Sequence, residues 1–391
     1  MKKKQEKERM IAIERYLKKE EPGTIAKSMG HSRQWVYKWI RRYEGRDDEQ
    51  DWCVDRSSSP QSRPGETTGD IVEAVKLVRL SLYNKGVFCG AQAIAWELEE
   101  LGVRPLPSIR TINRILSREE LTHRRTGRYQ PKGKIYPKLV GERVNEVHQM
   151  DYVGPCYLKG PTRFYSLNCV DLATGRCAVH PVLNKAGQST VDAIWSIWLR
   201  LGIPENQQVD NEAVFYGSRR YPRGMGTVIR LCLLSGVEPW FIPMAEPWRN
   251  GVVEKFNDHF RSRFLDRIPM NAEEDLLRES LTFEQKHNSR YRYTKLQGRT
   301  PQSALEQSRC KIRFPESPNA PAYPLPKPRS GRYHLVRFIR SDCLLDIFGE
   351  RFLLPPETAY EYVVSTVHVE RQKLTVGING VTVDEFDYQM G

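Results

Sequence analysis

The sequence predicts an α/β core, in which a mixed sheet is flanked by helices, between an all-α N-terminal part and a β-rich C-terminal part. Helical periodicity and N-cap residues mark residues 5–44 and 71–116. From residue 144 onward, apolar strand-like runs and helical segments follow in the order βββαβαβα. Near the end, Asn379-Gly380 between two apolar runs predicts a type I′ hairpin, because both turn positions need positive φ.

Composition narrows the classes of function. The 391 residues include 61 Lys and Arg against 48 Asp and Glu, a net charge of +13. This surplus makes nucleic acid the first partner to consider, and the helix-turn-helix modules described below specify double-stranded DNA. No long uncharged apolar run predicts a membrane span, and no apolar stretch follows the basic N-terminus as a signal peptide would require. Eight scattered cysteines without Cys-x-x-Cys spacing predict free thiols in a reducing, cytoplasmic compartment.

Shifts in composition divide the chain into seven parts. Six prolines between residues 315 and 328 favour an extended tether. The predicted parts are a helical module (1–56), a Ser/Pro/Gly linker (57–69), a second helical module (70–122), a basic arm (123–143), the α/β core (144–308), a Pro-rich linker (309–331) and a small β-barrel (332–391).

Both helical modules show the helix-turn-helix pattern. In the first, Gly30 separates two helices and Ser32 can cap the second; in the second, Gly102 closes one helix and Ser108 caps the next. Polar side chains away from the apolar faces are the candidates for DNA contact: Arg33, Gln34, Lys38 and Arg41, then Arg110, Asn113 and Arg114. The alternative for either module is an ordinary helical hairpin with a solvated basic face.

Residues 104–143 are the most basic stretch, with eleven Lys or Arg residues against three acids. Such an arm can neutralise phosphates and release counterions, with Arg124, Arg125 and Arg128 as candidate contacts. A linker that only aids solubility is the alternative.

Three acids occupy unusual positions. Asp151 lies within a strand in HQMDYVG, Asp210 ends a strand in QQVDNE, and Glu254 lies on a helix for which Pro247 fits the first position. A buried unpaired carboxylate costs several kcal/mol, so these acids need compensation. If they converge, their oxygens could hold two divalent cations about 3.5–4 Å apart, an arrangement suited to phosphoryl transfer. The alternative is that each acid is a surface residue or a cap.

The segments HQMDYVG, VDNE and AEPWRNGVVEKFND resemble the three motifs of the DDE transposase and retroviral integrase catalytic core superfamily. The resemblance implies an RNase H-like core with a mixed five-stranded sheet, followed by an SH3-like β-barrel. It implies that Asp151, Asp210 and Glu254 are catalytic and bind Mg²⁺, or Mn²⁺ in its place. With two helix-turn-helix modules, the chain is most similar to a bacterial insertion-sequence transposase.

That resemblance carries further expectations. Such an enzyme cleaves DNA at transposon ends and transfers the freed 3′-OH into target DNA. Lys255, beside Glu254, is then expected to contact DNA. Two ends need two active sites, so a homo-oligomer on DNA, associated with the bacterial nucleoid, is expected.

Two features leave alternatives open. The interval of 43 residues between Asp210 and Glu254 is longer than is usual in that family, and the surplus in 215–226 is either a basic DNA-contacting loop or a plain surface insertion. Glu212, Glu246 and Asp258 are neighbouring acids that could be confused with the three. The second hypothesis is a non-catalytic or domesticated DNA-binding regulator, and Asp210→Asn separates it from the enzyme. An RNase H-like nuclease would leave both modules without a role.

Overall fold

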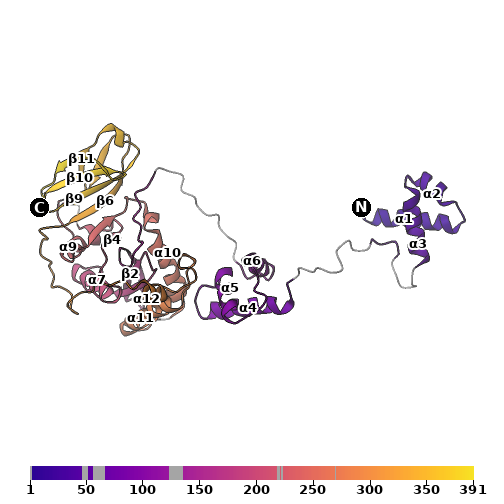
Figure 1. Cartoon of the computed structure of the whole chain (residues 1–391), viewed down its shortest axis with the longest axis horizontal. Coiled ribbons are helices and arrows are strands. Elements are labelled where there is room, and N and C mark those ends of the chain that lie inside the picture. The colour runs from indigo at the N-terminus through magenta and orange to yellow at the C-terminus, as the bar shows by residue number, and fades with distance from the viewer. Residues whose placement is uncertain are drawn as a thin grey trace. The chain divides into compact units, whose positions relative to one another are not determined.

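A computed structural model gives the fold, and it describes residues 2–45, 52–55, 67–122, 135–217, 221, 223–268 and 270–391. The chain divides into two compact units, Met1–Glu66 and Thr67–Gly391 (Figure 1). Most of the predicted linker 57–69 and the candidate arm residues Arg124, Arg125 and Arg128 lie outside the described ranges. None of the helices in those ranges combines the length and the apolar character that a membrane span needs.

The first unit is a three-helix module. Gly30 ends one helix with φ +71°, and the Ser32 hydroxyl caps the next by accepting from the Trp35 amide at 3.1 Å. Val36 and Trp39 lie in its apolar core. The predicted helix-turn-helix is therefore confirmed here. The helices are α1 (Lys2–Leu17), α2 (Pro22–Met29) and α3 (Arg33–Glu44).

The second unit begins with another three-helix module. Gly102 adopts φ +70° after the second helix, and the Ser108 hydroxyl accepts from the Thr111 amide at 3.1 Å, as the sequence predicts. Tyr291, from the core, is buried among the apolar side chains of these helices, and its hydroxyl donates to the Gly86 carbonyl at 2.6 Å. The module therefore packs on the core. Its helices are α4 (Gly69–Asn84), α5 (Ala91–Glu100) and α6 (Ile109–Arg118).

The core is the predicted mixed sheet with helices on both faces. Its strands run β3-β2-β1-β4-β5, with β1, β2 and β3 antiparallel and β1, β4 and β5 parallel. Apolar side chains of α7 and α9 cover one face, and those of α10 and α11 cover the other. The strands are β1 (Val147–Tyr157), β2 (Arg163–Asp171), β3 (Cys177–Val182), β4 (Asn206–Val209) and β5 (Glu238–Phe241). The helices are α7 (Gly187–Leu201), α8 (Ala213–Tyr216), α9 (Thr227–Leu234), α10 (Gly251–Phe260), α11 (Glu273–Arg290) and α12 (Pro301–Ser308).

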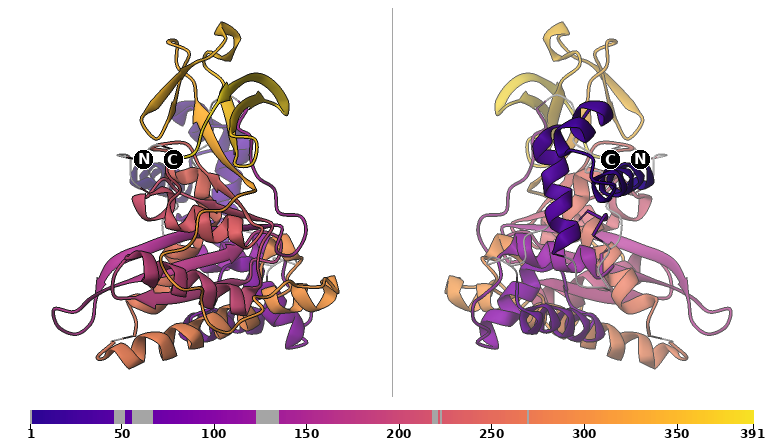
Figure 2. Two further views of the ribbon diagram at one scale, coloured as in Figure 1. Left: turned by 90° about the vertical axis from the view of Figure 1, so that its left-hand side faces the viewer. Right: turned by 90° about the vertical axis from the view of Figure 1, so that its right-hand side faces the viewer.

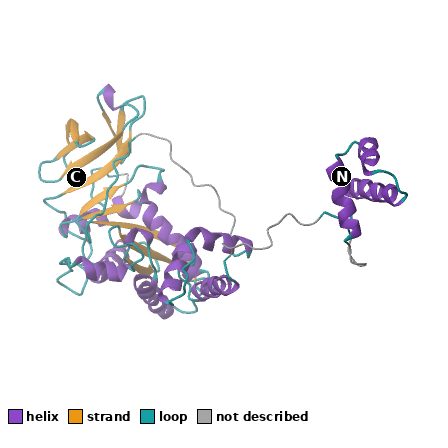
Figure 3. Ribbon diagram, turned by 45° about the vertical axis from the view of Figure 1, so that its right-hand side comes forward, coloured by secondary structure: helices purple, strands orange, loops and turns teal. Residues whose placement is uncertain are grey.

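The C-terminal region is rich in strands, as predicted, and it continues the core sheet. Strand β6 pairs in parallel with β5, which joins the strands into one sheet of order β11-β10-β9-β6-β5-β4-β1-β2-β3 (Figures 2 and 3). The β7–β8 hairpin forms a second small sheet, and its Phe352 ring lies 5.1 Å from that of Phe386. Positive φ at Asn379 and Gly380 confirms the predicted turn. The strands are β6 (Arg332–Phe338), β7 (Leu344–Ile347), β8 (Glu350–Leu353), β9 (Tyr362–His368), β10 (Lys373–Ile378) and β11 (Val381–Asp387).

The Pro-rich segment 309–331 has no helix or strand and lies against the core. The Trp195 indole on α7 donates to the Ser317 carbonyl at 3.0 Å, and the Tyr323 amide donates to the Gln188 side chain at 3.2 Å. Leu325 is buried in the main apolar core. These contacts fix the path along which the chain returns to β6.

Candidate active site

Strand register brings two of the three acids together. β1 and β4 pair in parallel from Val147 opposite Asn206 to Gln149 opposite Gln208. The same offset, continued along both chains, places Asp151 level with Asp210, the first residue after β4. Neighbouring strands lie about 4.8 Å apart, so two acids distant in sequence lie side by side where β4 ends next to the middle of β1.

The face on which Asp151 lies follows from Gln149. Side chains two residues apart on a strand point to the same face of the sheet. The Gln149 side-chain oxygen accepts from the backbone amides of Val252 and Val253, at 3.0 and 3.1 Å. Gln149 thereby satisfies free amide groups at the start of α10. Asp151 therefore faces α10, the helix that carries Glu254.

Asn250 ties the start of this helix to both strands that lead to the acids. Its side-chain amide donates to the Met150 carbonyl on β1 at 3.1 Å, and its side-chain oxygen accepts from Gln208 on β4 at 3.2 Å. Asn250 is only 2% exposed, so these bonds are protected from water. Since Gln208 shares its face with Asp210, the second acid is also directed towards α10.

The entry to α10 differs from the sequence prediction. Pro247 begins a 3-10 turn, Pro247–Asn250, and the α-helix starts only at Gly251. Such tighter turns are common at helix ends. The Asn250 side chain at the end of this turn lies inward against the sheet.

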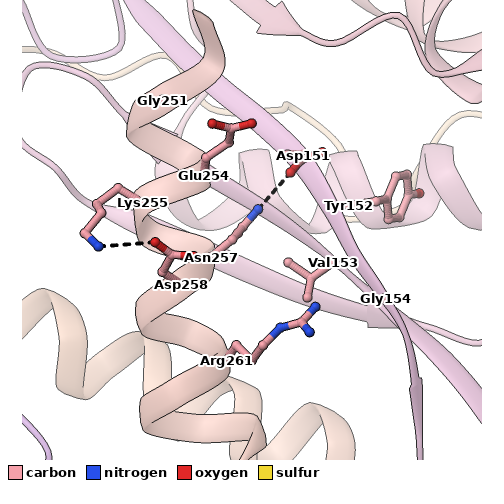
Figure 4. Close-up of a pocket in the computed structure, with 10 residues that line it drawn as sticks. All are labelled: Asp151, Tyr152, Val153, Gly154, Gly251, Glu254, Lys255, Asn257, Asp258 and Arg261. Carbon is pink, nitrogen blue, oxygen red and sulfur yellow. Dashed lines mark hydrogen bonds and ion pairs between the residues drawn. The ribbon is translucent and has the colours of Figure 1, made fainter. Parts of the chain in front are cut away.

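Asn257 is a site residue that sequence analysis missed (Figure 4). It lies three positions after Glu254, on the same side of α10. Its side-chain amide donates to the Asp151 carboxylate at 2.8 Å, and its oxygen accepts from Asn168 at 2.9 Å. Asn168 is the residue opposite Asp151 on β2. The helical spacing from Glu254 is the signal that could have pointed to Asn257.

The electrostatics of the three carboxylates are coupled. Burial, followed by the negative charges of Asp210, Glu254 and Glu212, raises the pKa of Asp151 to about 7. Burial also raises the pKa of Asp210, with Glu212 adding to the effect. For Glu254, burial comes first, and then Asp258 and Asp210, in raising the pKa. The site therefore holds closely spaced negative charge that a bound cation would stabilise.

The donor chemistry suits a hard divalent cation, since carboxylate oxygens are the ligands that Mg²⁺ and Mn²⁺ prefer. Asp151 and Glu254 line one pocket, together with Lys255, Asn257 and Arg261 among others (Figure 4). Asp210 is not among its lining residues. Within the described part of the chain, no three His, Cys, Asp or Glu side chains are close enough to form a complete metal cage.

The neighbouring acids have other partners. Glu212 pairs with Lys185 at 2.5 Å, and Glu246 pairs with Arg249 at 2.9 Å. Asp258 lines the pocket and pairs with Lys255 at 3.2 Å. Each of the three is thus engaged within the protein, whereas burial and mutual repulsion act on Asp151 and Glu254.

The candidate DNA-contacting residues lie in three places. On α3, Arg33, Gln34, Lys38 and Arg41 are exposed. On α6, Arg110, Asn113 and Arg114 are exposed. Lys255 is exposed at the rim of the acidic pocket.

One arginine of the long interval between Asp210 and Glu254 has a structural role. Arg223 pairs with Glu350 on β8 at 2.5 Å, and its guanidinium lies over the Tyr388 ring at 5.0 Å from the centroid. This contact attaches the insertion 215–226 to the C-terminal strands. Arg219 and Arg220 lie outside the described residues.

Comparison with known proteins gives a family match for the first unit alone. The homeodomain-like domain matches residues 3–50, which include α2, α3 and all of α1 except Lys2. A comparison with curated proteins gave no match. The helix-turn-helix region is thus of the homeodomain-like type.

Several solved integrase structures are similar to the chain. The HTLV-2 integrase catalytic core domain in complex with magnesium, in its dimeric form, is 18% identical, with 41% of this chain and 97% of that chain covered and a TM-score of 0.32. A chain of the simian T-cell lymphotropic virus intasome in complex with the PP2A regulatory subunit B56 gamma is 14% identical, with 81% of this chain and 97% of that chain covered and a TM-score of 0.36. The BIV integrase catalytic core domain is 17% identical, with 42% and 95% covered and a TM-score of 0.31. The roles of residues in this chain are therefore inferred from its own geometry.

Proposed function

We propose that this protein is a DDE-type DNA transposase or integrase, which cleaves DNA at transposon ends and transfers the 3′-OH into target DNA. The observation that best supports this is the placement of three acids: strand register sets Asp151 level with Asp210, and Asp151 and Glu254 line one pocket. They come from two parallel strands and the helix packed across them, and their charges act on one another. A fold that needs only stability has no reason to gather such repulsion at one place.

In this proposal Asp151, Asp210 and Glu254 hold Mg²⁺, or Mn²⁺ in its place. When bound, the divalent ions supply activation of the attacking oxygen and stabilisation of the leaving oxygen in phosphoryl transfer. Asn257 holds the Asp151 carboxylate in place through its 2.8 Å bond. Lys255, at the pocket rim, binds the DNA backbone beside the scissile phosphate.

The two helix-turn-helix modules hold the DNA in this proposal. The exposed polar residues of α3 and α6 contact the terminal repeats, and the basic arm 123–143 neutralises phosphates of the same DNA. Cutting two transposon ends requires two active sites, so the protein acts as a homo-oligomer on DNA.

The test is a cleavage reaction on DNA that carries the flanking element ends, with Mg²⁺ or Mn²⁺ and with nicks mapped to the nucleotide. Asp210→Asn is expected to bind the ends as the wild type does and to lose cleavage. The matched control is Asp192→Asn, at an exposed position on α7, which is expected to cleave normally.

Two outcomes would contradict the proposal. If Asp210→Asn cleaves as well as the wild type, the carboxylates are not catalytic. If the wild type binds the ends without nicking them, the protein is a non-catalytic DNA-binding regulator. Cleavage of an RNA·DNA hybrid, tested in parallel, would instead identify an RNase H-like nuclease.

A further inference from the structure

A buried arginine of the C-terminal region reaches the loop that follows Asp210. Arg337 lies on β6 and is only 6% exposed. Its Nη2 donates to the side-chain oxygen of Asn211 at 3.1 Å, and its Nη1 donates to the Ile242 carbonyl at 3.3 Å. A guanidinium can hold several acceptors in one plane, which a lysine ammonium cannot do.

These bonds close a small network at the ends of β4 and β5. The Asn211 side-chain amide also donates to the Ile242 carbonyl, at 2.5 Å. The Ile242 amide donates to the Val209 carbonyl, immediately before Asp210, at 3.2 Å. Arg337 is therefore bonded directly to Asn211, which follows Asp210, and is connected through Ile242 to Val209, which precedes it. Hydrogen bonds from a charged donor in a buried place are among the stronger ones.

Tyr362 on β9 makes a second contact of this kind, with the segment that leads into α10. Its hydroxyl donates to the Glu246 carboxylate at 2.8 Å and accepts from Arg249 at 3.0 Å. Glu246 and Arg249 are themselves paired at 2.9 Å. Glu246 immediately precedes the Pro247 turn, so Tyr362 fixes the start of the helix that carries Glu254.

We propose that the C-terminal strands form part of the scaffold of the active site, with Arg337 as the positioning residue for Asp210 and Tyr362 as that for the helix of Glu254. This inference rests on the proposed function, since it takes these two acids as metal ligands. Neither Arg337 nor Tyr362 touches the reacting atoms. Both act by fixing the groups next to metal ligands, and the removal of such supporting bonds typically costs about 10–100-fold in metal affinity or activity.

The experiment measures Mn²⁺ binding by electron paramagnetic resonance, and the Mn²⁺ dependence of end cleavage, with the full chain. Arg337→Lys keeps the positive charge and removes the planar guanidinium, which donates to Asn211 and Ile242 at the same time. It is expected to weaken Mn²⁺ binding about tenfold, to recover cleavage at high Mn²⁺ and to leave end binding unchanged. The matched control is Arg332→Lys on the same strand, an exposed residue paired with Glu238, for which no change in Mn²⁺ binding is expected.

Two further variants approach the same bonds differently. Asn211→Ala removes the side-chain oxygen that accepts the hydrogen bond from Arg337. It is expected to weaken Mn²⁺ binding about as much as Arg337→Lys, and the double variant little more, because both break one interaction. Tyr362→Phe removes a single hydroxyl and is expected to weaken Mn²⁺ binding roughly fivefold. The control is Tyr360→Phe, at an exposed position.

The outcomes separate this inference from the proposed function. If the wild type binds Mn²⁺ and cleaves, and all three variants show the wild-type Mn²⁺ dependence, the inference is wrong and the function stands. If the wild type binds Mn²⁺ through Asp210 but does not cleave, the proposed function fails. The role of Arg337 is then decided by whether Arg337→Lys binds Mn²⁺ more weakly than the wild type. If the wild type binds no Mn²⁺, both fail. Thermal unfolding shows whether each variant folds. If Arg337→Lys does not fold, the Mn²⁺ binding of Asn211→Ala and Tyr362→Phe tests the inference in its place.

Discussion

Asp151 combines a stability cost with a proposed function. It lies within a strand, it is largely buried, and three further carboxylates raise its pKa in addition to burial. Among the described residues, one other side chain, that of Asn257, donates a hydrogen bond to the Asp151 carboxylate. A neutral amide can stabilise the carboxylate but cannot cancel its charge, so the metal-free protein holds an ionised Asp151 at a cost in folding free energy.

This cost predicts a pH-dependent effect of Asp151→Asn on stability. In the unfolded chain Asp151 ionises near 3.8, and in the folded protein near 7. As pH rises between these values, the unfolded state gives up a proton that the folded state keeps, so the free energy of unfolding of the wild type falls. Asn cannot ionise and avoids this loss. With EDTA present, the variant is expected to be more stable at pH 8 by up to about 4 kcal/mol, and by much less at pH 5.

Thermal unfolding of both proteins at the two pH values measures this difference. The control is Asp192→Asn, which is expected to shift the melting temperature equally at pH 5 and pH 8. A stability gap between Asp151→Asn and wild type that does not change with pH would show that Asp151 ionises in the folded protein as it does in the unfolded chain.

At the scale of elements, the placement of α10 depends on side chains of the strands beneath it. Gln149 on β1 bonds the first free amides of the helix, and Asn250 joins the turn before it to β1 and β4. The helix is thereby fixed to the same two strands that position Asp151 and Asp210. The same hydrogen bonds therefore set the position of α10 relative to Asp151 and Asp210.

Asn250→Ala is therefore expected to affect both stability and catalysis. The change leaves the Met150 carbonyl and the Gln208 side chain without these partners in a buried place, which is expected to lower the free energy of unfolding by about 1–3 kcal/mol. Urea unfolding measures this decrease. End cleavage should fall while end binding remains. Asn271→Ala, at an exposed position, is the control, and an equal decrease in stability in the two variants would contradict the role of Asn250.

The DNA-binding helices give a prediction on salt dependence. If the α3 residues bind phosphates, the triple variant of Arg33, Lys38 and Arg41 to Ala should reduce the slope of log K against log salt by about 0.9 for each phosphate that is no longer neutralised. Filter binding or fluorescence anisotropy at several salt concentrations measures the slope. A variant with the wild-type slope would show that α3 does not bind the DNA backbone.

Local features of these elements were predictable from the sequence, and distant ones were not. The caps at Ser32 and Ser108 and the Asn379-Gly380 turn depend on neighbouring residues only, and all three are present. The bond from Gln149 to α10 joins residues more than a hundred positions apart. Periodicity and turn chemistry do not report such partners, so Asn250 and Asn257 gained a role only from the structure.

For the whole molecule, the main finding is the continuity of the sheet from the core into the C-terminal strands. The sequence predicts these strands but treats them as a separate part, because the pairing that joins them is short. Only Trp240 and Phe241 on β5 pair with His334 and Leu335 on β6. The three acids of the candidate site stay a prediction from their motifs and from their positions on strands and a helix. Their mutual charge effects and their support from β6 and β9 required the folded chain.

The most direct test of the central claim is to locate metal ions in crystals of the protein grown or soaked with Mn²⁺, by the anomalous scattering of manganese. We expect an anomalous peak bounded by the carboxylates of Asp151, Asp210 and Glu254, and its disappearance in Asp210→Asn. Full-occupancy manganese bound elsewhere, with no peak among these three side chains, would contradict the claim.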